Sequence, residues 1–291
     1  MRVFISGASG LVGYNCMQLF KHMEWPVLGT YFSYPIPDTV YFNTLDVNDA
    51  NNADLLAFKP DVVVHCGALT HVDYCETHQD ESYQKTVQST LNLLELSKQC
   101  GARFVFLSTD YVFDGQAGPY SETDAVNPLS VYAKHKLAAE EAVKAVPNSL
   151  ILRITNVYGT EYRNKNFIAR IVQQCLAGET LELTLPYDQY ATPVNAADVA
   201  LAMYCLLRDG HEGLFHIAST DWMNRVELAQ RVLQYFPEAK FNLQMKSTAE
   251  LNQPAPRPLI GGLLKTKFSN LYPNFQFGNV DDFMRDILRE A

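Results

Sequence analysis

The feature that most constrains the fold is an alternation of short apolar runs and helical patterns over residues 1–155. Residues 61–65 (DVVVH) contain an uninterrupted run of valines, which is typical of a strand buried on both faces. Similar strands are expected at residues 2–6, 27–31, 103–107 and 150–155, and helices at residues 11–23, 49–58, 79–100 and 131–146. Short buried strands separated by helices predict parallel βαβ units with right-handed crossovers. The sequence therefore predicts an α/β fold with a Rossmann-type doubly wound parallel sheet.

Composition and charge exclude several classes of function. The formal net charge is −9 and no basic stripe is present, which argues against nucleic acid as a partner. No stretch approaches the roughly 20 apolar residues of a membrane span, and the N-terminus lacks the pattern of a signal peptide. The six cysteines form no CxxC pair and the seven histidines form no HExxH motif, so no metal site is expected. We expect a cytoplasmic protein with reduced thiols.

A glycine-rich turn follows the first strand and precedes the first helix. It reads Gly7-Ala-Ser-Gly10-Leu-Val-Gly13, so its spacing is GxxGxxG. The first glycine permits the tight turn, the second allows the backbone close to a pyrophosphate, and the third allows the helix to pack near the strand. Free N–H groups at the helix start then hold the diphosphate. We expect a dinucleotide to contact Gly7, Ser9, Gly10, Leu11, Val12 and Gly13.

The end of the second strand should choose between NAD and NADP. An acidic residue there would hold the ribose 2′-hydroxyl, but the sequence Gly29-Thr-Tyr-Phe-Ser33 contains neither an acid nor an Arg or Lys. Absence of the acid removes a repulsion against a 2′-phosphate, and the hydroxyls of Thr30 and Ser33 can donate to one. The sequence therefore favours NADP(H) over NAD(H).

Tyr132 and Lys136 form a YxxxK motif at the expected start of a helix. Positions i and i+4 lie on one helix face, so the hydroxyl and the ammonium point into the same space. A nearby ammonium favours the phenolate and lowers the pKa of the phenol, which makes Tyr132 a proton donor for a carbonyl that is being reduced. Ser108-Thr109-Asp110 follows the strand at 103–107, at the carboxyl edge where ligands bind. The Thr109 hydroxyl is expected to hold the same carbonyl.

The alternation of short apolar strands and helices becomes less regular after Gly159, which predicts a smaller second lobe. Helices are expected at residues 166–176 and 195–207, a strand at 214–218, and loops at 186–193 and 253–262. We expect the NAD(P)-binding Rossmann domain to span residues 1–160 with a returning segment at about 194–220. Residues 161–193 and 221–291 are expected to form a substrate-binding lobe.

Three segments together resemble the dTDP-4-dehydrorhamnose reductase family of extended short-chain dehydrogenases. They are LSTDYVFDG at 107–115, YSETD at 120–124 and NPLSVYAK at 127–134. The resemblance implies a catalytic triad of Thr109, Tyr132 and Lys136. It implies cofactor contacts at Gly7, Gly10, Gly13, Asp46, Val47, Gly67, Ala68, Ser108, Tyr132 and Lys136. It implies a sugar nucleotide bound by Thr70, Val72, Thr109, Asp110, Asn156, Gln189 and Arg257, with Arg257 at the phosphates.

The chain departs from that family at one segment near the sugar. Members of the family have a Trp there that packs on the sugar, whereas this chain reads Thr155-Asn156-Val157. Asn156 offers hydrogen bonds in place of stacking, so we expect a sugar with different hydroxyls near the reacting carbon. Tyr111, where a dehydratase has Glu, disfavours dehydration. The activity expected is reduction of a 4-keto group on a nucleotide-activated deoxysugar, with a homodimer as the candidate assembly. The alternative is a non-catalytic NADP-binding subunit similar to the beta subunit of methionine adenosyltransferase.

Overall fold

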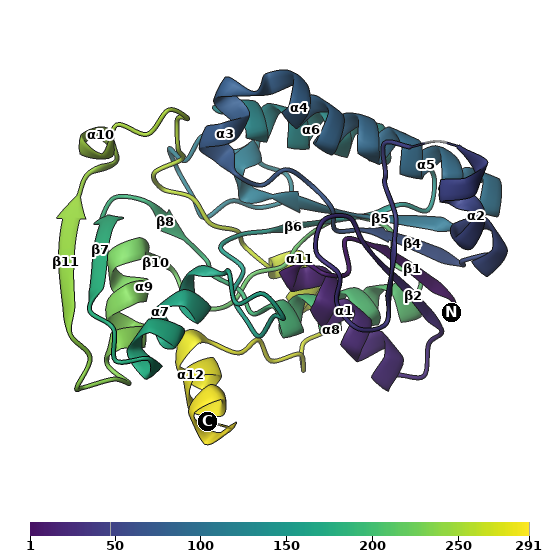
Figure 1. The fold of residues 1–291 in the computed structure, drawn as a ribbon. Helices are drawn as coiled ribbons and strands as arrows, with labels where there is room; N and C mark the ends of the chain where they lie inside the picture. Colours follow the sequence, from purple (N-terminus) through teal and green to yellow (C-terminus); the bar gives the residue numbers. More distant parts are fainter. Residues whose placement is uncertain (47, 291) are drawn as a thin grey trace.

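A seven-stranded parallel sheet forms the centre of the computed structural model, which describes residues 1–46 and 48–290. The strand order is β3-β2-β1-β4-β5-β6-β9 (Figure 1). The strands are β1 (Val3–Ser6), β2 (Val27–Tyr31), β3 (Thr39–Tyr41), β4 (Val62–His65), β5 (Arg103–Thr109), β6 (Leu150–Ile154) and β9 (Gly213–His216). The order reverses between β1 and β4, which is where doubly wound sheets bind ligands. The predicted fold class is confirmed.

Helices cover both faces of this sheet (Figure 1). The helices α1 (Leu11–His22) and α8 (Ala196–Arg208) pack on one face with Val3 and Ile5 of β1. Phe4, between those two residues, points to the other face and packs with α5 (Ser89–Cys100) and α6 (Val131–Lys144). The helix α2 (Asp49–Phe58) contributes Leu55 to that second face. Successive side chains of a strand point to opposite faces, so a fully buried strand is apolar throughout.

The helix expected at residues 79–100 is a continuous helical segment with a local irregularity. It begins as α4 (Gln79–Tyr83), passes through a π-helical stretch at η1 (Gln84–Gln88) and continues as α5. A separate short helix, α3 (Val72–Thr77), precedes it. A π-helical turn changes the direction of side chains along the helix. Here Ser89, just after the π turn, faces the buried ring of His65 at 3.2 Å.

The second lobe stands beside the carboxyl edge of the sheet (Figure 1). Its core lies among α7 (Phe167–Leu176), α9 (Arg225–Leu233), β7 (Leu181–Pro186) and α12 (Val280–Glu290). Its remaining elements are β8 (Tyr190–Ala191), β10 (Met223–Asn224), β11 (Phe241–Lys246) and α10 (Thr248–Leu251). β11 pairs in parallel with β7, and β10 pairs antiparallel with β8. The sequence did not predict β3, β7, β8, β10 or β11, and β8 lies within the segment 186–193 that was expected to be a loop.

The segment at residues 263–277 returns to the first lobe, before α12 rejoins the second. Within α11 (Thr266–Leu271), Phe268 is fully buried in the core that α1 and α8 form on the sheet. Tyr272, Phe275 and Phe277 pack against the same core. We propose a Rossmann lobe that contains residues 1–160, 194–220 and this returning segment, with the rest as the substrate lobe. In the described part of the chain, no helix has the length and apolarity needed to cross a bilayer.

Candidate active site

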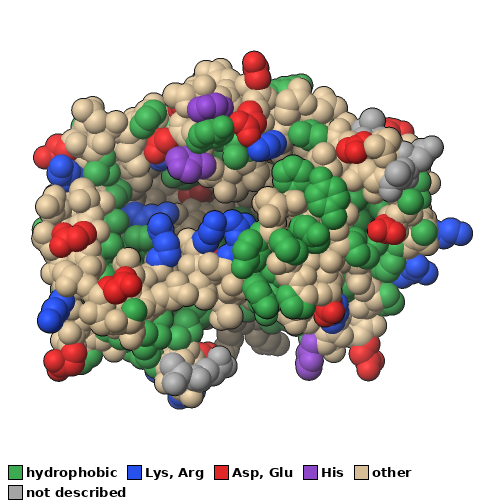
Figure 2. Space-filling model, viewed as in Figure 1, with side chains coloured by type: hydrophobic (Ala, Val, Ile, Leu, Met, Phe, Trp, Pro, Cys, Tyr) green, Lys and Arg blue, Asp and Glu red, His purple; other side chains and the backbone are tan. Residues whose placement is uncertain are grey.

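A cleft of about 670 Å³ runs along the carboxyl edge of the sheet, from the glycine turn to the second lobe. Figure 2 shows a hollow on this face with Lys and Arg side chains gathered in it. The predicted site residues that line the cleft are Gly7, Ser9, Gly10, Leu11, Val12, Gly13, Ser33, Gly67, Ala68, Thr70, Val72, Ser108, Thr109, Asp110, Tyr132, Lys136 and Asn156. The fold therefore brings together residues that are up to about 150 positions apart in the sequence.

The glycine turn has the shape that a dinucleotide diphosphate requires. Gly7 has a φ of +77°, which side chains other than glycine rarely adopt. A Cβ on Gly13 would lie 2.3 Å from the Gly7 carbonyl oxygen, so only glycine allows α1 to pack this close to β1. No side chain caps the start of α1 at Gly10, which leaves the N–H groups of its first turn for an anion. These residues fit the diphosphate of a dinucleotide.

The catalytic candidates lie at the middle of the cleft. Ser130 caps α6, since its Oγ accepts a hydrogen bond from the Ala133 N–H at 3.2 Å, and this cap sets Tyr132 at the helix start. One turn later, Lys136 Nζ donates to the Leu107 carbonyl oxygen at 2.5 Å. Thr109 ends β5 and its hydroxyl donates to Asp110 Oδ1 at 3.3 Å. The three predicted side chains therefore line one cleft.

Burial dominates the protonation of these groups. Burial raises the pKa of Tyr132, and the nearby Tyr111 and Asp110 raise it further, while a hydrogen bond with Thr109 opposes them. The lowering of this pKa that the sequence predicted from Lys136 is therefore not found in the structure. Burial lowers the pKa of Lys136 to about 7, although the charge of Glu140 opposes this shift. Tyr132 is consequently a protonated phenol at neutral pH, which suits a donor of protons. Burial also raises the pKa of Asp110 to about 6.

A buried ion pair supports the floor of the cleft. Arg153 on β6 and Glu140 on α6 are both almost fully buried. Arg153 Nε donates to Glu140 Oε2 at 3.0 Å, and its Nη2 donates to Oε1 of the same carboxylate. Ser108 Oγ donates to Glu140 Oε2 at 2.7 Å. The Ser108 hydroxyl, predicted to contact the cofactor, is thus used to hold α6 against the end of β5.

Several predicted contacts are not brought to the main cleft. The Thr30 hydroxyl is buried and donates to the Ile5 carbonyl oxygen at 3.1 Å, so the expectation that it reaches a 2′-phosphate is corrected. Arg257 forms an ion pair with Asp73 at 2.9 Å with its side chain only 8% exposed, so this guanidinium joins the second lobe to α3. Gln189 lines a small adjoining pocket. Asp46 accepts a hydrogen bond from the Asn48 N–H, and Val47 lies outside the described residues.

Sequence reasoning missed the cations of the second lobe that line the cleft: Arg163, Lys165 and Arg225. Arg225 is the first residue of α9, where Asn224 and Glu227 form a capping box. Its guanidinium donates to Asn156 Oδ1 and lies 5.1 Å from the centre of the Phe167 ring. Burial lowers its pKa, and none of the described carboxylates lies within ion-pair distance of it. Arg225 is a cation facing the ligand space.

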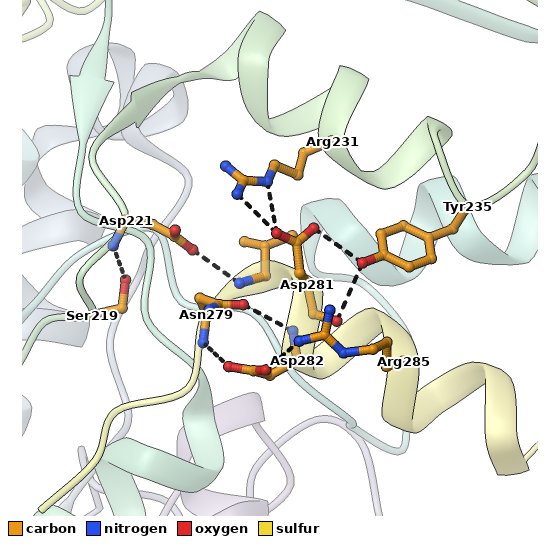
Figure 3. Close-up of polar contacts among 9 residues, drawn as sticks. Ser219, Asp221, Arg231, Tyr235, Asn279, Asp281, Asp282 and Arg285 are labelled. Carbon is orange, nitrogen blue, oxygen red and sulfur yellow. Dashed lines mark hydrogen bonds and ion pairs between the residues drawn. The ribbon is translucent and has the colours of Figure 1, made fainter.

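The last helix fixes the approach to α9, as Figure 3 shows. Arg231 of α9 donates two hydrogen bonds to Asp281 Oδ2, at 3.0 and 2.8 Å. Tyr235 donates to Asp281 Oδ1 at 3.1 Å, so two side chains hold one carboxylate. The Val280 N–H donates to Asp221 Oδ2 at 2.9 Å, which ties α12 to the loop before β10. These contacts fix the segment that presents Arg225 to the cleft.

Comparison with known proteins gives consistent matches. The family model described as the RmlD substrate binding domain matches residues 1–277. Methionine adenosyltransferase 2 subunit beta of Bos taurus is 32% identical over 243 residues, which cover 81% of this chain and 72% of that protein. A probable low-salt glycan biosynthesis reductase of Haloferax volcanii is 30% identical over 265 residues, covering 89% and 88%. The crystal structure of a dTDP-4-dehydrorhamnose reductase of Clostridium acetobutylicum superposes with a TM-score of 0.84 at 28% identity, covering 99% and 100%.

Proposed function

Because the chain belongs to the RmlD substrate binding domain family, we propose that it is an NAD(P)H-dependent reductase of a 4-keto group on a nucleotide-activated deoxysugar. The observation that carries the proposal is the position of Thr109, Tyr132 and Lys136 in one cleft with the glycine turn. Carbonyl reduction needs a proton donor, a group that holds the carbonyl oxygen and a bound dinucleotide. The Tyr132 phenol, the Thr109 hydroxyl and the Lys136 ammonium beside the glycine turn can serve these purposes. The similarity to the Clostridium acetobutylicum enzyme supports the same chemistry.

The residues of the cleft divide the work of the reduction. When bound, the reduced nicotinamide supplies the hydride to the carbonyl carbon. Tyr132 donates its phenolic proton to the carbonyl oxygen, and burial keeps that proton in place until the oxygen becomes basic. The Thr109 hydroxyl holds the same oxygen. Lys136, whose ammonium is oriented by the Leu107 carbonyl oxygen, binds the nicotinamide ribose.

A nicotinamide dinucleotide is the cofactor, and we propose NADP(H) as the preferred form. No acidic side chain stands between Gly29 and Ser33, where an acid would repel a 2′-phosphate. Ser33 and Phe32 line the cleft at that end. A protein that prefers NADH by tenfold or more in direct binding would contradict this part of the proposal.

The substrate end of the cleft is cationic, which fits an anionic sugar nucleotide. We expect Arg225→Met to raise KM for the sugar nucleotide by about 10- to 100-fold, because a hydrogen bond to a charged group contributes roughly 1.5–3 kcal/mol. The effect on kcat should be smaller, since a contact with an anionic group of the substrate is made in the ground state as well as in the transition state. The measurement is steady-state kinetics at saturating cofactor.

The matched control is Arg170→Met, which removes an exposed arginine of the neighbouring helix α7 that does not line the cleft. Its KM should stay within about twofold of the wild type. An equal rise in KM for both substitutions would mean that the overall positive charge of the second lobe attracts the substrate. The contact assigned to Arg225 would then be wrong.

The test of the proposed activity uses purified protein, NADPH and a panel of nucleoside diphosphate 4-keto-6-deoxysugars. Oxidation of NADPH with formation of the 4-hydroxy sugar is the expected result for at least one member of the panel. Binding of NADPH without oxidation by any member, although each sugar binds, would overturn the proposal. The panel should include sugars that differ in their hydroxyls near the keto group, because Asn156 faces the cleft where stacking is expected in relatives.

A second candidate is a non-catalytic regulatory subunit. It is favoured by the similarity to methionine adenosyltransferase 2 subunit beta in several animals. The discriminating measurement is a mixture of this protein with a methionine adenosyltransferase catalytic subunit. Formation of a stable complex without turnover of any sugar would favour regulation, whereas turnover without a complex favours the reductase.

A further inference from the structure

A loop of the second lobe contacts α1, the helix that follows the glycine turn. Residues 160–165 lie between β6 and α7. Asn15 of α1 donates a hydrogen bond to the Thr160 carbonyl oxygen at 3.0 Å, and the rings of Tyr14 and Tyr162 meet edge to face at 6.5 Å. These contacts tie the loop to the helix that follows the glycine turn.

The loop is held in shape from within by a buried carboxylate. Glu161 is only 7% exposed, and its Oε1 accepts hydrogen bonds from the Lys165 N–H at 2.8 Å and the Asn166 N–H at 2.7 Å. The Asn166 side chain also donates to Glu161 Oε1 and to the Gly159 carbonyl oxygen. A loop fixed at both ends in this way presents its remaining side chains in a defined direction.

Arg163 is presented at the end of β2. Its guanidinium lies 5.2 Å from the centre of the Tyr34 ring, and its side chain lines the same cleft as Phe32 and Ser33. Arg163 Nε is buried without a hydrogen-bond partner among the described residues, and no described carboxylate pairs with the guanidinium. A buried donor without a partner is costly, so an anion that accepts from it would be favoured there.

We propose that Arg163 binds the 2′-phosphate of NADP(H) and so sets the cofactor preference, an inference that rests on the proposed function. The planar guanidinium stacks on Tyr34 and offers a fork of donors that matches a phosphate monoester. Ser33 lines the same cleft and offers a hydroxyl. The cofactor diphosphate has its own donors at the start of α1, so Arg163 is left for the additional phosphate. The residue that discriminates between NADP(H) and NAD(H) thus comes from the second lobe, about 130 positions after β2.

The test compares two fragments that differ only in the 2′-phosphate, namely 2′,5′-ADP and 5′-AMP, by titration calorimetry without any sugar. The wild type should bind 2′,5′-ADP more tightly. Arg163→Ala should raise the Kd of 2′,5′-ADP by about 10- to 100-fold and leave the Kd of 5′-AMP within about twofold of the wild type. Arg163→Lys should recover part of the loss, because a lysine keeps the charge but not the fork. NADPH and NADH should follow the same pattern.

Arg170→Ala is the matched control, since it removes an exposed arginine of the neighbouring helix α7 that does not line the cleft. This control should raise the Kd of 2′,5′-ADP by less than about threefold. An equal loss in both variants, an equal loss of 2′,5′-ADP and 5′-AMP in Arg163→Ala, or a wild type without preference for 2′,5′-ADP would each overturn the inference. These results leave the proposed reduction of a ketosugar untouched, because that proposal fails only if NADPH is bound and no ketosugar is reduced. A wild type without preference for 2′,5′-ADP would contradict the proposed preference for NADP(H) as well.

Discussion

Replacing Tyr132 by Phe is expected to lower kcat by about 10²- to 10⁴-fold, the contribution of a positioned general acid. The substitution removes only the phenolic oxygen and keeps the ring that meets Tyr111 edge to face at 6.0 Å. Because the ring stays, the Kd of NADPH should change by no more than about twofold. The measurement is single-turnover oxidation of NADPH with the best substrate of the panel, together with a direct cofactor titration.

Tyr83→Phe is the control for this experiment, because Tyr83 is a partly exposed tyrosine of α4 that does not line the cleft. Its kcat should equal that of the wild type. If Tyr132→Phe retained kcat, another group would have to protonate the carbonyl oxygen, and the role given to Tyr132 would be wrong. Loss of NADPH binding in Tyr132→Phe would instead point to a damaged cleft.

The largest expected effect on stability is that of Arg153→Met. The substitution leaves the Glu140 carboxylate buried without its main partner, and breaking one side of a buried pair typically costs about 3–5 kcal/mol. Lys144 Nζ still lies 3.1 Å from Glu140 Oε1, so we expect the lower end, about 3 kcal/mol. Denaturant unfolding at neutral pH measures this difference in the free energy of unfolding.

The stability that Arg153→Met loses should be smaller at acidic pH than at neutral pH. Burial alone would raise the pKa of Glu140, but Arg153, Ser108 and Lys144 outweigh burial and hold it below its ordinary value. A carboxyl whose pKa is lower in the folded protein contributes stability above its unfolded pKa and loses it as the pH falls. The gap between wild type and Arg153→Met should therefore narrow as the solution is acidified below about pH 4.5.

The double variant Arg153→Met/Glu140→Leu tests the cause of the loss. Removing both charges leaves no buried ion, so this variant should recover more than half of the stability lost by Arg153→Met alone. A single variant within about 1 kcal/mol of the wild type would contradict the account. So would a double variant less stable than the single one, because the loss would then come from packing.

The sequence by itself determined the α/β architecture and the positions of the three catalytic candidates along it. The valine run of β4, the helical periods and the turn Gly7–Gly13 are local patterns, and burial on both faces or a tight turn constrains residues close together in the chain. Tyr132 and Lys136 are one helical turn apart, and Thr109 ends a strand whose middle residues, 104–107, are apolar and buried. Each of these signals is short in range, so it can be read before the chain folds.

The tertiary structure decided which polar side chains face the cleft. Thr30 and Arg257 have the right chemistry for a phosphate, but Thr30 bonds to Ile5 within the sheet and Arg257 pairs with Asp73. Arg163 and Arg225 reach the cleft from loops and helices of the second lobe, and no local pattern marks them. The partner of a long polar side chain depends on which distant segments pack beside it, and only the folded chain fixes that neighbourhood.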